Sequence, residues 1–130
     1  MFPVNDLTVL IVTYKTNNKI LEDCIKSING KSKIIIVENS NDEDFKKKYE
    51  EKFSNIEVFL SGKNLGYGSG NNFGLNLIKT NYALISNPDV IYEDEFFSSI
   101  DYYIKQNTDF DIIGPMYRTK DYASYGYFED

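Results

Sequence analysis

Two carboxylates in the 130-residue sequence follow short apolar runs, where they could take part in chemistry. Glu38 follows "IIIV", and a carboxylate there could accept a hydrogen bond from the N–H of a base or a sugar. Asp89 stands in "ISNPDV", after Asn87 and Pro88. Proline fixes its own φ and directs the preceding residue toward extended geometry, so Asp89 has a fixed direction at the end of its run.

A third polar segment, "KNLGYGSGNNFG", has four glycines from Gly66 to Gly74 and asparagines at 64, 71 and 72. Glycine permits positive φ and close approach of the backbone to a ligand, and asparagine offers both a donor and an acceptor. A helix that begins near Asn71 would direct its free N–H groups outward, which suits a phosphate or a carboxylate. The alternative is a flexible loop followed by a helix cap.

Composition excludes several other kinds of chemistry. There is no histidine, which removes Ser-His and Cys-His nucleophiles and histidine metal sites. Cys24 is the single cysteine, so no internal disulfide forms.

The net charge of −6 disfavours nucleic acid and an anionic membrane surface as main partners. Without a signal peptide or a membrane span, we expect a cytoplasmic location, either free or peripheral to the inner face of the membrane.

Two segments resemble phosphate-binding motifs only superficially. Gly30-Lys31-Ser32 looks like the tail of a phosphate-binding loop, but Ile25 stands where that motif needs glycine. The glycines of "GYGSG" follow the third predicted strand, whereas a dinucleotide fingerprint follows the first. The acidic run 93–95 is the kind of charge that favours a helix N-terminus.

The elements that position these residues alternate regularly along the chain. Five short runs of apolar, β-branched or aromatic residues predict strands at Leu7–Tyr14, Lys33–Val37, Ile56–Leu60, Tyr82–Ser86 and Phe110–Gly114. Helical spacing occurs between them, with apolar faces at Ile20, Leu21, Cys24, Ile25 and Ile28; at Phe45, Tyr49 and Phe53; at Phe73 and Leu77; and at Phe96, Phe97, Ile100, Tyr103 and Ile104. Asn17 or Asn18 is the expected N-cap of the first helix, and Gly30 lies just past its end.

This alternation predicts one doubly wound α/β domain over residues 1–130, with a mostly parallel sheet of five strands. Ligands of such folds bind beyond the carboxyl ends of the strands. The residues at those ends are therefore the candidates for a functional site.

Four blocks, "LTVLIVTYK", "IIIVENS", "NLGYGSGNNFGL" and "ISNPDV", in this order and spacing, resemble the N-terminal half of the inverting family 2 glycosyltransferases. The Asn-Pro-Asp form and the glycine-rich block are most similar to the branch that contains rhamnosyltransferases. The resemblance covers residues 7 to 117. It implies a GT-A, Rossmann-like fold, a nucleotide-sugar donor, and hexosyl or deoxyhexosyl transfer with inversion to a carbohydrate or glycolipid acceptor in polysaccharide biosynthesis.

The resemblance also implies roles for individual residues. Thr13 and Tyr14 would flank the nucleoside, and Glu38 would read the uracil or thymine N–H of a UDP- or dTDP-sugar. Asn39, the next residue, would also belong to the donor-binding site. Asp89, at the family's Asp-x-Asp motif, would hold Mg²⁺ or Mn²⁺, with Asn87 in place of the first acid. The loop over base and diphosphate would contain Asn64, Gly66, Tyr67, Gly70 and Asn72.

The group that would deprotonate the acceptor hydroxyl is unknown. The resemblance places it in a later acidic motif. The segment "YGYFED" superficially resembles the aromatic and acidic stretch around that motif, but it comes only about 40 residues after Asp89. We therefore expect a shortened form or remnant of a longer enzyme, incomplete for catalysis.

Two other classes stay open. One is a non-catalytic interaction or regulatory module that keeps the fold and self-associates through the tyrosine-rich C-terminal stretch. The other is an unrelated doubly wound domain such as a receiver, with Asp89 as phospho-acceptor. A receiver would need an acidic pair after the first strand, where this chain has Thr13, Tyr14 and Lys15.

Overall fold

The computed structural model describes residues 6–107, 109–115, 117–118 and 123–124. A four-stranded parallel sheet in the order β3-β2-β1-β4 is built from β1 (Leu7–Thr13), β2 (Lys33–Glu38), β3 (Ile56–Leu60) and β4 (Tyr82–Ser86). The helices are α1 (Asn18–Ile28), α2 (Glu43–Lys52), α3 (Gly66–Leu75) and α4 (Phe96–Gln106). A short antiparallel pair, β5 (Tyr117–Arg118) and β6 (Ala123–Ser124), follows. The predicted α/β class with a mostly parallel sheet is confirmed.

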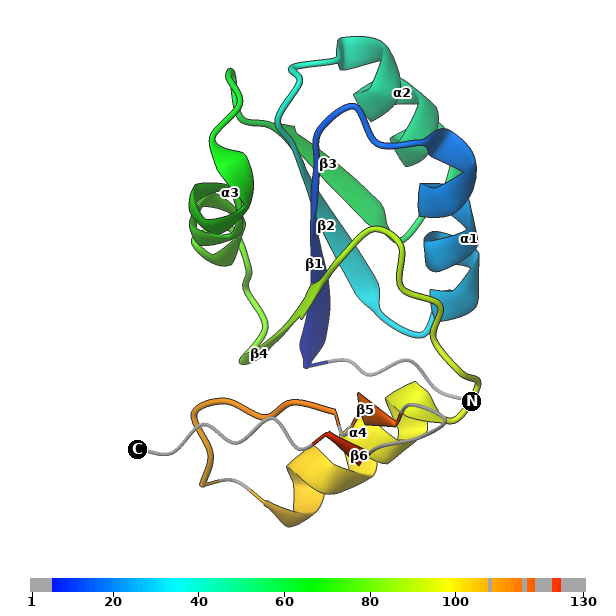
Figure 1. The fold of residues 1–130 in the computed structure, drawn as a ribbon, viewed down its shortest axis with the longest axis vertical. Helices are drawn as coiled ribbons and strands as arrows, with labels where there is room; N and C mark the ends of the chain where they lie inside the picture. Colours follow the sequence, from blue (N-terminus) through cyan, green and yellow to red (C-terminus); the bar gives the residue numbers. More distant parts are fainter. Residues whose placement is uncertain (1–5, 108, 116, 119–122, 125–130) are drawn as a thin grey trace.

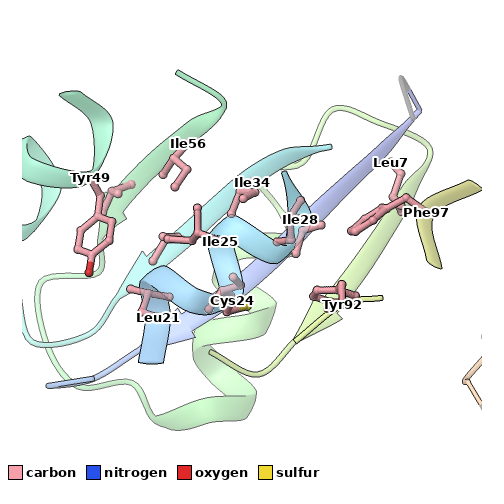
Figure 2. Close-up of a cluster of buried hydrophobic side chains, with 14 residues drawn as sticks. Leu7, Leu21, Cys24, Ile25, Ile28, Ile34, Tyr49, Ile56, Tyr92 and Phe97 are labelled. Atoms are coloured by element: carbon pink, nitrogen blue, oxygen red, sulfur yellow. The ribbon is translucent and has the colours of Figure 1, made fainter. Parts of the chain in front are cut away.

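The two faces of the sheet are covered by different helices (Figure 1). In β1, Val9 and Ile11 pack in the larger core cluster with α1 and α2, whereas Leu10 and Val12 face α3. Successive side chains of a strand point to opposite faces of the sheet, and helices cover both faces. The central strands are therefore apolar at nearly every position. Figure 2 shows the larger cluster. Each fully buried Leu, Ile or Val side chain contributes roughly 1.5–3 kcal/mol of transfer free energy.

Helix α1 has the predicted start and end. Asn17 is its N-cap and accepts a hydrogen bond from the N–H of Ile20 at 3.2 Å, and Asn29 closes it in the left-handed conformation. The predicted apolar face is correct except at Ile20, which is 47% exposed. Leu21, the next residue in the same first turn, is fully buried, so the buried face of α1 begins at Leu21.

Helix α3 begins at Gly66, and the predicted start near Asn71 is wrong. Glycine is a poor helix former, at about 1 kcal/mol below alanine, so the sequence favoured a loop here. The reason for the helix is packing. A Cβ added at Gly70 would lie 2.9 Å from Val12 Cγ1, and one at Gly74 would overlap Leu10 Cδ1. The absence of side chains at these positions lets α3 approach β1 closely.

The predicted fifth strand at Phe110–Gly114 is not formed, and the parallel sheet has four strands. Phe110 instead packs against the rings of Tyr82 and Tyr103, with ring centroids 5.7 and 6.0 Å apart. A strand needs a hydrogen-bonding neighbour, and within the described residues this run has none. Its β-type composition is therefore not sufficient to define a strand.

Candidate functional site

The carboxyl ends of three strands are tied to one another in register. Thr13 pairs with Glu38, and Glu38 pairs with Leu60 on the next strand. The connection continues past the strands, because the N–H of Asn39 donates to Thr13 O at 2.8 Å and the N–H of Ser61 donates to Glu38 O at 3.2 Å. The loops that leave β1, β2 and β3 therefore share one edge of the sheet.

The Glu38 carboxylate is buried and turned into its own loop. Its exposed fraction is 1%. Oε2 accepts hydrogen bonds from the N–H groups of Ser40 and Asp42 at 3.1 and 3.0 Å, and Oε1 accepts the Ser40 hydroxyl. The Glu38 carboxylate, which can accept about four hydrogen bonds, thus accepts them from three donor groups of its own loop. The carboxylate orders the loop that leads into α2, and contact with a nucleobase would require this loop to rearrange.

Asn39 joins three elements through its side chain. Nδ2 donates to Gly66 O at 3.1 Å, and Oδ1 accepts a hydrogen bond from Ser61 Oγ at 2.7 Å. Asn39 is 2% exposed. Its amide therefore fixes the start of α3 against the ends of β2 and β3, so the structure gives it a positioning contact.

The first turn of α3 is open toward the surface. Asn64 Oδ1 accepts a hydrogen bond from the N–H of Gly66 at 3.0 Å, and Gly66 has a φ of +76°. Leu65, the N-cap, provides no side-chain hydrogen bond, so the next N–H groups of the turn are not capped by a side chain. Tyr67 is 53% exposed beside them.

Two buried oxygens have no hydrogen-bond partner among the described residues: Thr13 Oγ1 and Asn71 Oδ1. Thr13 was predicted from the sequence, but Asn71 was missed in favour of Asn72, which is exposed. Helical spacing in the sequence could have indicated that Asn71 is buried. Gly70 and Gly74 are four residues apart and therefore share the sheet-facing side of α3, and Asn71 lies next to Gly70. An unsatisfied buried acceptor costs roughly 1–3 kcal/mol, so each oxygen is a candidate contact for a ligand.

The Asn87–Val90 turn has a fixed main chain and exposed side chains. Asn87 O accepts hydrogen bonds from the Val90 N–H at 3.5 Å and from Ser86 Oγ at 3.0 Å, and it lies 3.9 Å from the Cys24 thiol, which donates to it. The side chains of Asn87 and Asp89 both face solvent. The turn therefore presents an amide and a carboxylate from an ordered backbone.

A second layer of contacts lies behind this turn. The Tyr92 N–H donates to Ser27 Oγ at 3.0 Å, and Ser27 Oγ donates to Cys24 O at 2.6 Å. Burial raises the pKa of Tyr92 to about 12 and that of Cys24 to about 11. Both groups are thus protonated near neutral pH and act as hydrogen-bond donors.

Tyr14 lies at the rim of this edge, just past the end of β1. Its side chain is 47% exposed, and Lys15 Nζ lies 5.4 Å from the centroid of its ring. Lys15 has a φ of +48°, a conformation that turns the chain sharply after β1. Tyr14 is thus about half exposed beside the strand end, and the Lys15 ammonium group lies over its ring.

Asp89 offers a single carboxylate, so it could hold a metal ion only if a bound ligand supplied further oxygen atoms. Over residues 6–107 and the short described segments after them, no group of three or more His, Cys, Asp or Glu side chains could hold an ion. Mg²⁺ and Mn²⁺ often take one or two carboxylates and complete their shells with phosphate oxygens. The chemistry of a single exposed carboxylate fits that arrangement.

The predictions about a membrane span and about the C-terminal stretch concern other parts of the chain. Among the helices that the structure describes, none has both the length and the apolar character needed to span a bilayer. The side chains of the tyrosine-rich C-terminal stretch and the segment "YGYFED" lie outside the described residues, so their predicted roles stay predictions.

A parallel sheet covered on both faces, with polar groups gathered beyond the carboxyl ends of its strands, is the arrangement of a doubly wound α/β protein. The family model for glycosyl transferase family 2 matches residues 8–129. This chain therefore belongs to glycosyl transferase family 2.

Curated relatives agree with that membership. The low-salt glycan biosynthesis hexosyltransferase Agl10 of Haloferax volcanii is 30% identical over 116 residues, which cover 86% of this chain and 36% of that protein. An uncharacterized glycosyltransferase of Methanocaldococcus jannaschii is 27% identical over 115 residues, which cover 82% of this chain and 40% of that protein. The chain spans less than half the length of these relatives.

Proposed function

We propose that this chain is the donor-binding part of a glycosyltransferase and binds a nucleoside diphosphate sugar, with uridine or thymidine as the nucleoside. The observation that carries the proposal is the Asn87–Val90 turn, whose main chain is held from behind while Asn87 and Asp89 are exposed at the end of β4. Family membership supports the class of ligand.

The neighbouring residues supply the rest of the proposed donor site. Thr13, whose buried hydroxyl has no hydrogen-bond partner among the described residues, and Tyr14, which is about half exposed, would contact the nucleoside. The uncapped first turn of α3 would attract the diphosphate, because helix N-termini carry partial positive charge. Asn64 and Asn39 would keep this turn in place through their bonds to Gly66.

Asp89 would hold a divalent ion, Mg²⁺ or Mn²⁺, together with the diphosphate. When bound, such an ion neutralises the charge that develops on a departing diphosphate. Asn87 would contribute a neutral oxygen or a hydrogen bond beside it. Among the residues that the structure describes we assign no base of the kind that an inverting transfer requires, so we expect donor binding without sugar transfer by this chain alone.

The test is a thermal shift measurement with UDP- and dTDP-sugars, with and without Mn²⁺ or Mg²⁺. At a ligand concentration of about 100 Kd, binding stabilises the fold by about 2.7 kcal/mol, which raises the melting temperature by several degrees. Asp89→Ala is expected to remove the metal-dependent part of the shift. Asp94→Ala, which removes another exposed carboxylate, is the matched control and should keep it. If no nucleotide shifts the melting temperature, the proposal is rejected.

A non-catalytic binding module is the second candidate function. It is favoured by the Glu38 carboxylate, whose hydrogen bonds lie within its own loop and leave it turned away from a ligand. Such a module would show the same melting temperature with and without nucleotides. It would instead associate with itself or with another protein, which sedimentation velocity would detect.

A further inference from the structure

Lys15, in the loop between β1 and α1, has an unusual backbone conformation. Its φ is +48°, in the left-handed region, which is unfavourable for a residue with a Cβ atom. Asparagine is strongly enriched in this region. The other two non-glycine residues with positive φ in the described part of the chain are indeed asparagines, Asn29 and Asn41. Local backbone preference therefore does not explain a lysine at this position.

Hydrogen bonds before and after Lys15 hold the loop in this conformation. The Tyr14 N–H donates to Thr16 Oγ1 at 3.3 Å. Thr13 O accepts a hydrogen bond from the N–H of Asn39 at 2.8 Å, which fixes the loop to the end of β2. Residues that the surrounding structure holds in an unfavourable conformation are concentrated at functional sites. The conformation of Lys15 thus directs attention to its side chain.

The ammonium group of Lys15 has no carboxylate partner among the described residues. Its side chain is exposed, and Nζ lies over the ring of Tyr14, 5.4 Å from the ring centroid. Most other lysines in this part of the chain form ion pairs with aspartate or glutamate: Lys19, Lys26, Lys33, Lys46, Lys48, Lys52 and Lys105. The charge of Lys15 therefore stands at the rim of the strand ends without a neighbouring negative charge to neutralise it.

Asn39 brings the Lys15 loop next to the first turn of α3. Its main-chain N–H donates to Thr13 O, and its side-chain Nδ2 donates to Gly66 O at 3.1 Å. Figure 1 shows both segments at the same end of the sheet. A lysine side chain is a flexible four-carbon stem with a point charge at its tip. The ammonium group is thus placed to reach a ligand that lies between Tyr14 and Gly66.

An anionic ligand needs a local positive charge on this protein. The net charge of −6 opposes the approach of a nucleotide that carries phosphate groups. The exposed carboxylate of Asp89 adds a negative charge at the end of β4. Lys15 provides the opposite charge beside the tyrosine that the donor-binding proposal assigns to the nucleoside. Lysine ammonium groups commonly bind phosphate in proteins as point charges.

We propose that Lys15 is a specificity-determining residue that binds the phosphate groups of the nucleotide and so selects a nucleoside diphosphate over the nucleoside alone. This contact does not require a metal ion, in contrast to the contact proposed for Asp89. The inference rests on the donor-binding proposal and adds the residue that recognises the charge of the donor.

The test measures affinities by isothermal titration calorimetry with the full 130-residue chain. The ligands are uridine and UDP, and thymidine and dTDP, in EDTA to remove divalent ions. The parent is expected to bind each diphosphate more tightly than its nucleoside. In Lys15→Asn the affinity for the diphosphate should fall roughly five- to tenfold at low salt, and that for the nucleoside should stay within about twofold. Salt screens exposed charges, so the loss should shrink between about 50 mM and about 500 mM KCl.

Two further variants separate the charge of Lys15 from other effects. Lys15→Arg keeps a positive charge in the same loop and should retain most of the preference for the diphosphate. Lys79→Asn removes an exposed lysine that precedes β4, at the opposite end of the parallel sheet, and should leave all affinities unchanged. Lys79, like Lys15, has no ion-pair partner in the described part of the chain.

The melting temperature without ligand provides a second measurement. Asparagine fits the left-handed conformation better than lysine, so Lys15→Asn should melt at the same temperature as the parent or a few degrees higher. A variant of this stability that binds the diphosphate less tightly has not lost affinity through unfolding. A lower melting temperature would mean that Lys15 supports the fold instead, and would overturn the inference.

The other outcomes distinguish this inference from the donor-binding proposal. If Lys15→Asn binds the diphosphate as tightly as the parent, the inference fails and the donor-binding proposal stands. The same conclusion follows if Lys15→Arg loses as much affinity as Lys15→Asn, or if the parent binds the diphosphate only with Mn²⁺ or Mg²⁺ present. If the parent binds no nucleotide even with these ions, the donor-binding proposal is rejected and this inference with it.

Discussion

The Tyr92 hydroxyl lies 2.6 Å from Ser86 Oγ and donates a hydrogen bond to it, and Ser86 Oγ donates in turn to Asn87 O at 3.0 Å. This relay connects a buried aromatic ring to the turn that carries Asp89. Pro88 limits the turn from within, and the relay fixes it from behind. The direction of the Asp89 carboxylate therefore depends on residues that are themselves not exposed.

Tyr92→Phe removes only the hydroxyl of this relay. We expect the free energy of unfolding to fall by about 1–3 kcal/mol, because Ser86 Oγ loses a buried donor. If donor binding occurs, its metal-dependent part should weaken more than its metal-independent part. Urea unfolding and the thermal shift series measure the two effects. Tyr102→Phe is the control, since Tyr102 is 68% exposed, and it should change neither.

Glu38→Gln tests the loop that leads into α2. The substitution replaces one carboxylate oxygen by an NH₂ group. This group would place N–H donors against the N–H groups of Ser40 and Asp42, which now donate to the carboxylate. We expect a loss of about 1–3 kcal/mol in the free energy of unfolding. Glu51→Gln, an exposed change on α2, should stay within about 0.5 kcal/mol of the parent. Equal stabilities of the two variants would contradict the observed role of the carboxylate.

Gly74→Ala and Gly68→Ala make the same change on one helix with opposite expected signs. A Cβ at position 74 would overlap the Leu10 side chain, so α3 must shift, at a cost of about 1–3 kcal/mol. Apart from the neighbouring residues and the backbone of α3 itself, no atom of the described residues lies within 4 Å of the corresponding position at Gly68, so there the substitution should stabilise α3 by up to about 1 kcal/mol. Denaturant unfolding of the two variants checks both signs. A similar loss in both would show that α3 does not pack on β1 as described.

The stability of the fold should decrease in alkaline solution. Burial raises the pKa of Cys24 from 9.0 to about 11 and that of Tyr92 from 10.0 to about 12. Both folded-state values exceed the unfolded ones, so the stabilising effect is complete below pH 9 and is lost as pH rises toward 11 and 12. Urea unfolding from about pH 7.5 to about pH 10.5 should show a flat region and then a decline.

Cys24→Ala separates the contribution of the thiol to this decline. The variant should be less stable near neutral pH because a buried side chain is truncated, and its stability should fall less steeply between about pH 9 and about pH 10. An unchanged slope would mean that Cys24 ionises as easily in the folded as in the unfolded protein.

Local patterns predicted most of the sheet but not its extent. The first four predicted strands occur in the structure, with β1 ending at Thr13 and β2 extending to Glu38. Their apolar runs carry enough information because both faces of these strands are covered. Phe110–Gly114 failed because a strand is defined by its neighbour, which a local pattern does not contain. The start of α3 failed for a related reason, since contacts with Leu10 and Val12 outweigh the low helix propensity of glycine.

The candidate site, like the sheet, was predicted only in part from local sequence patterns. The sequence located the loops at the strand ends, because the position of each loop follows from the strand before it. It did not reveal which way a side chain turns. Glu38 faces into its own loop, and Asn71, rather than Asn72, is the buried asparagine of α3. These orientations depend on contacts between segments that lie far apart along the chain.

The side chain of Asn39, which bonds to Gly66 and to Ser61, has a consequence for the thermodynamics of binding. Loops that move independently must each be ordered when a ligand arrives, at roughly 0.5–1.5 kcal/mol for every mobile side chain that is immobilised. Here one amide links two of these segments to the end of β2 in the free protein. A ligand that contacts either segment meets a surface whose order is already established, so less of its interaction energy is lost to conformational entropy.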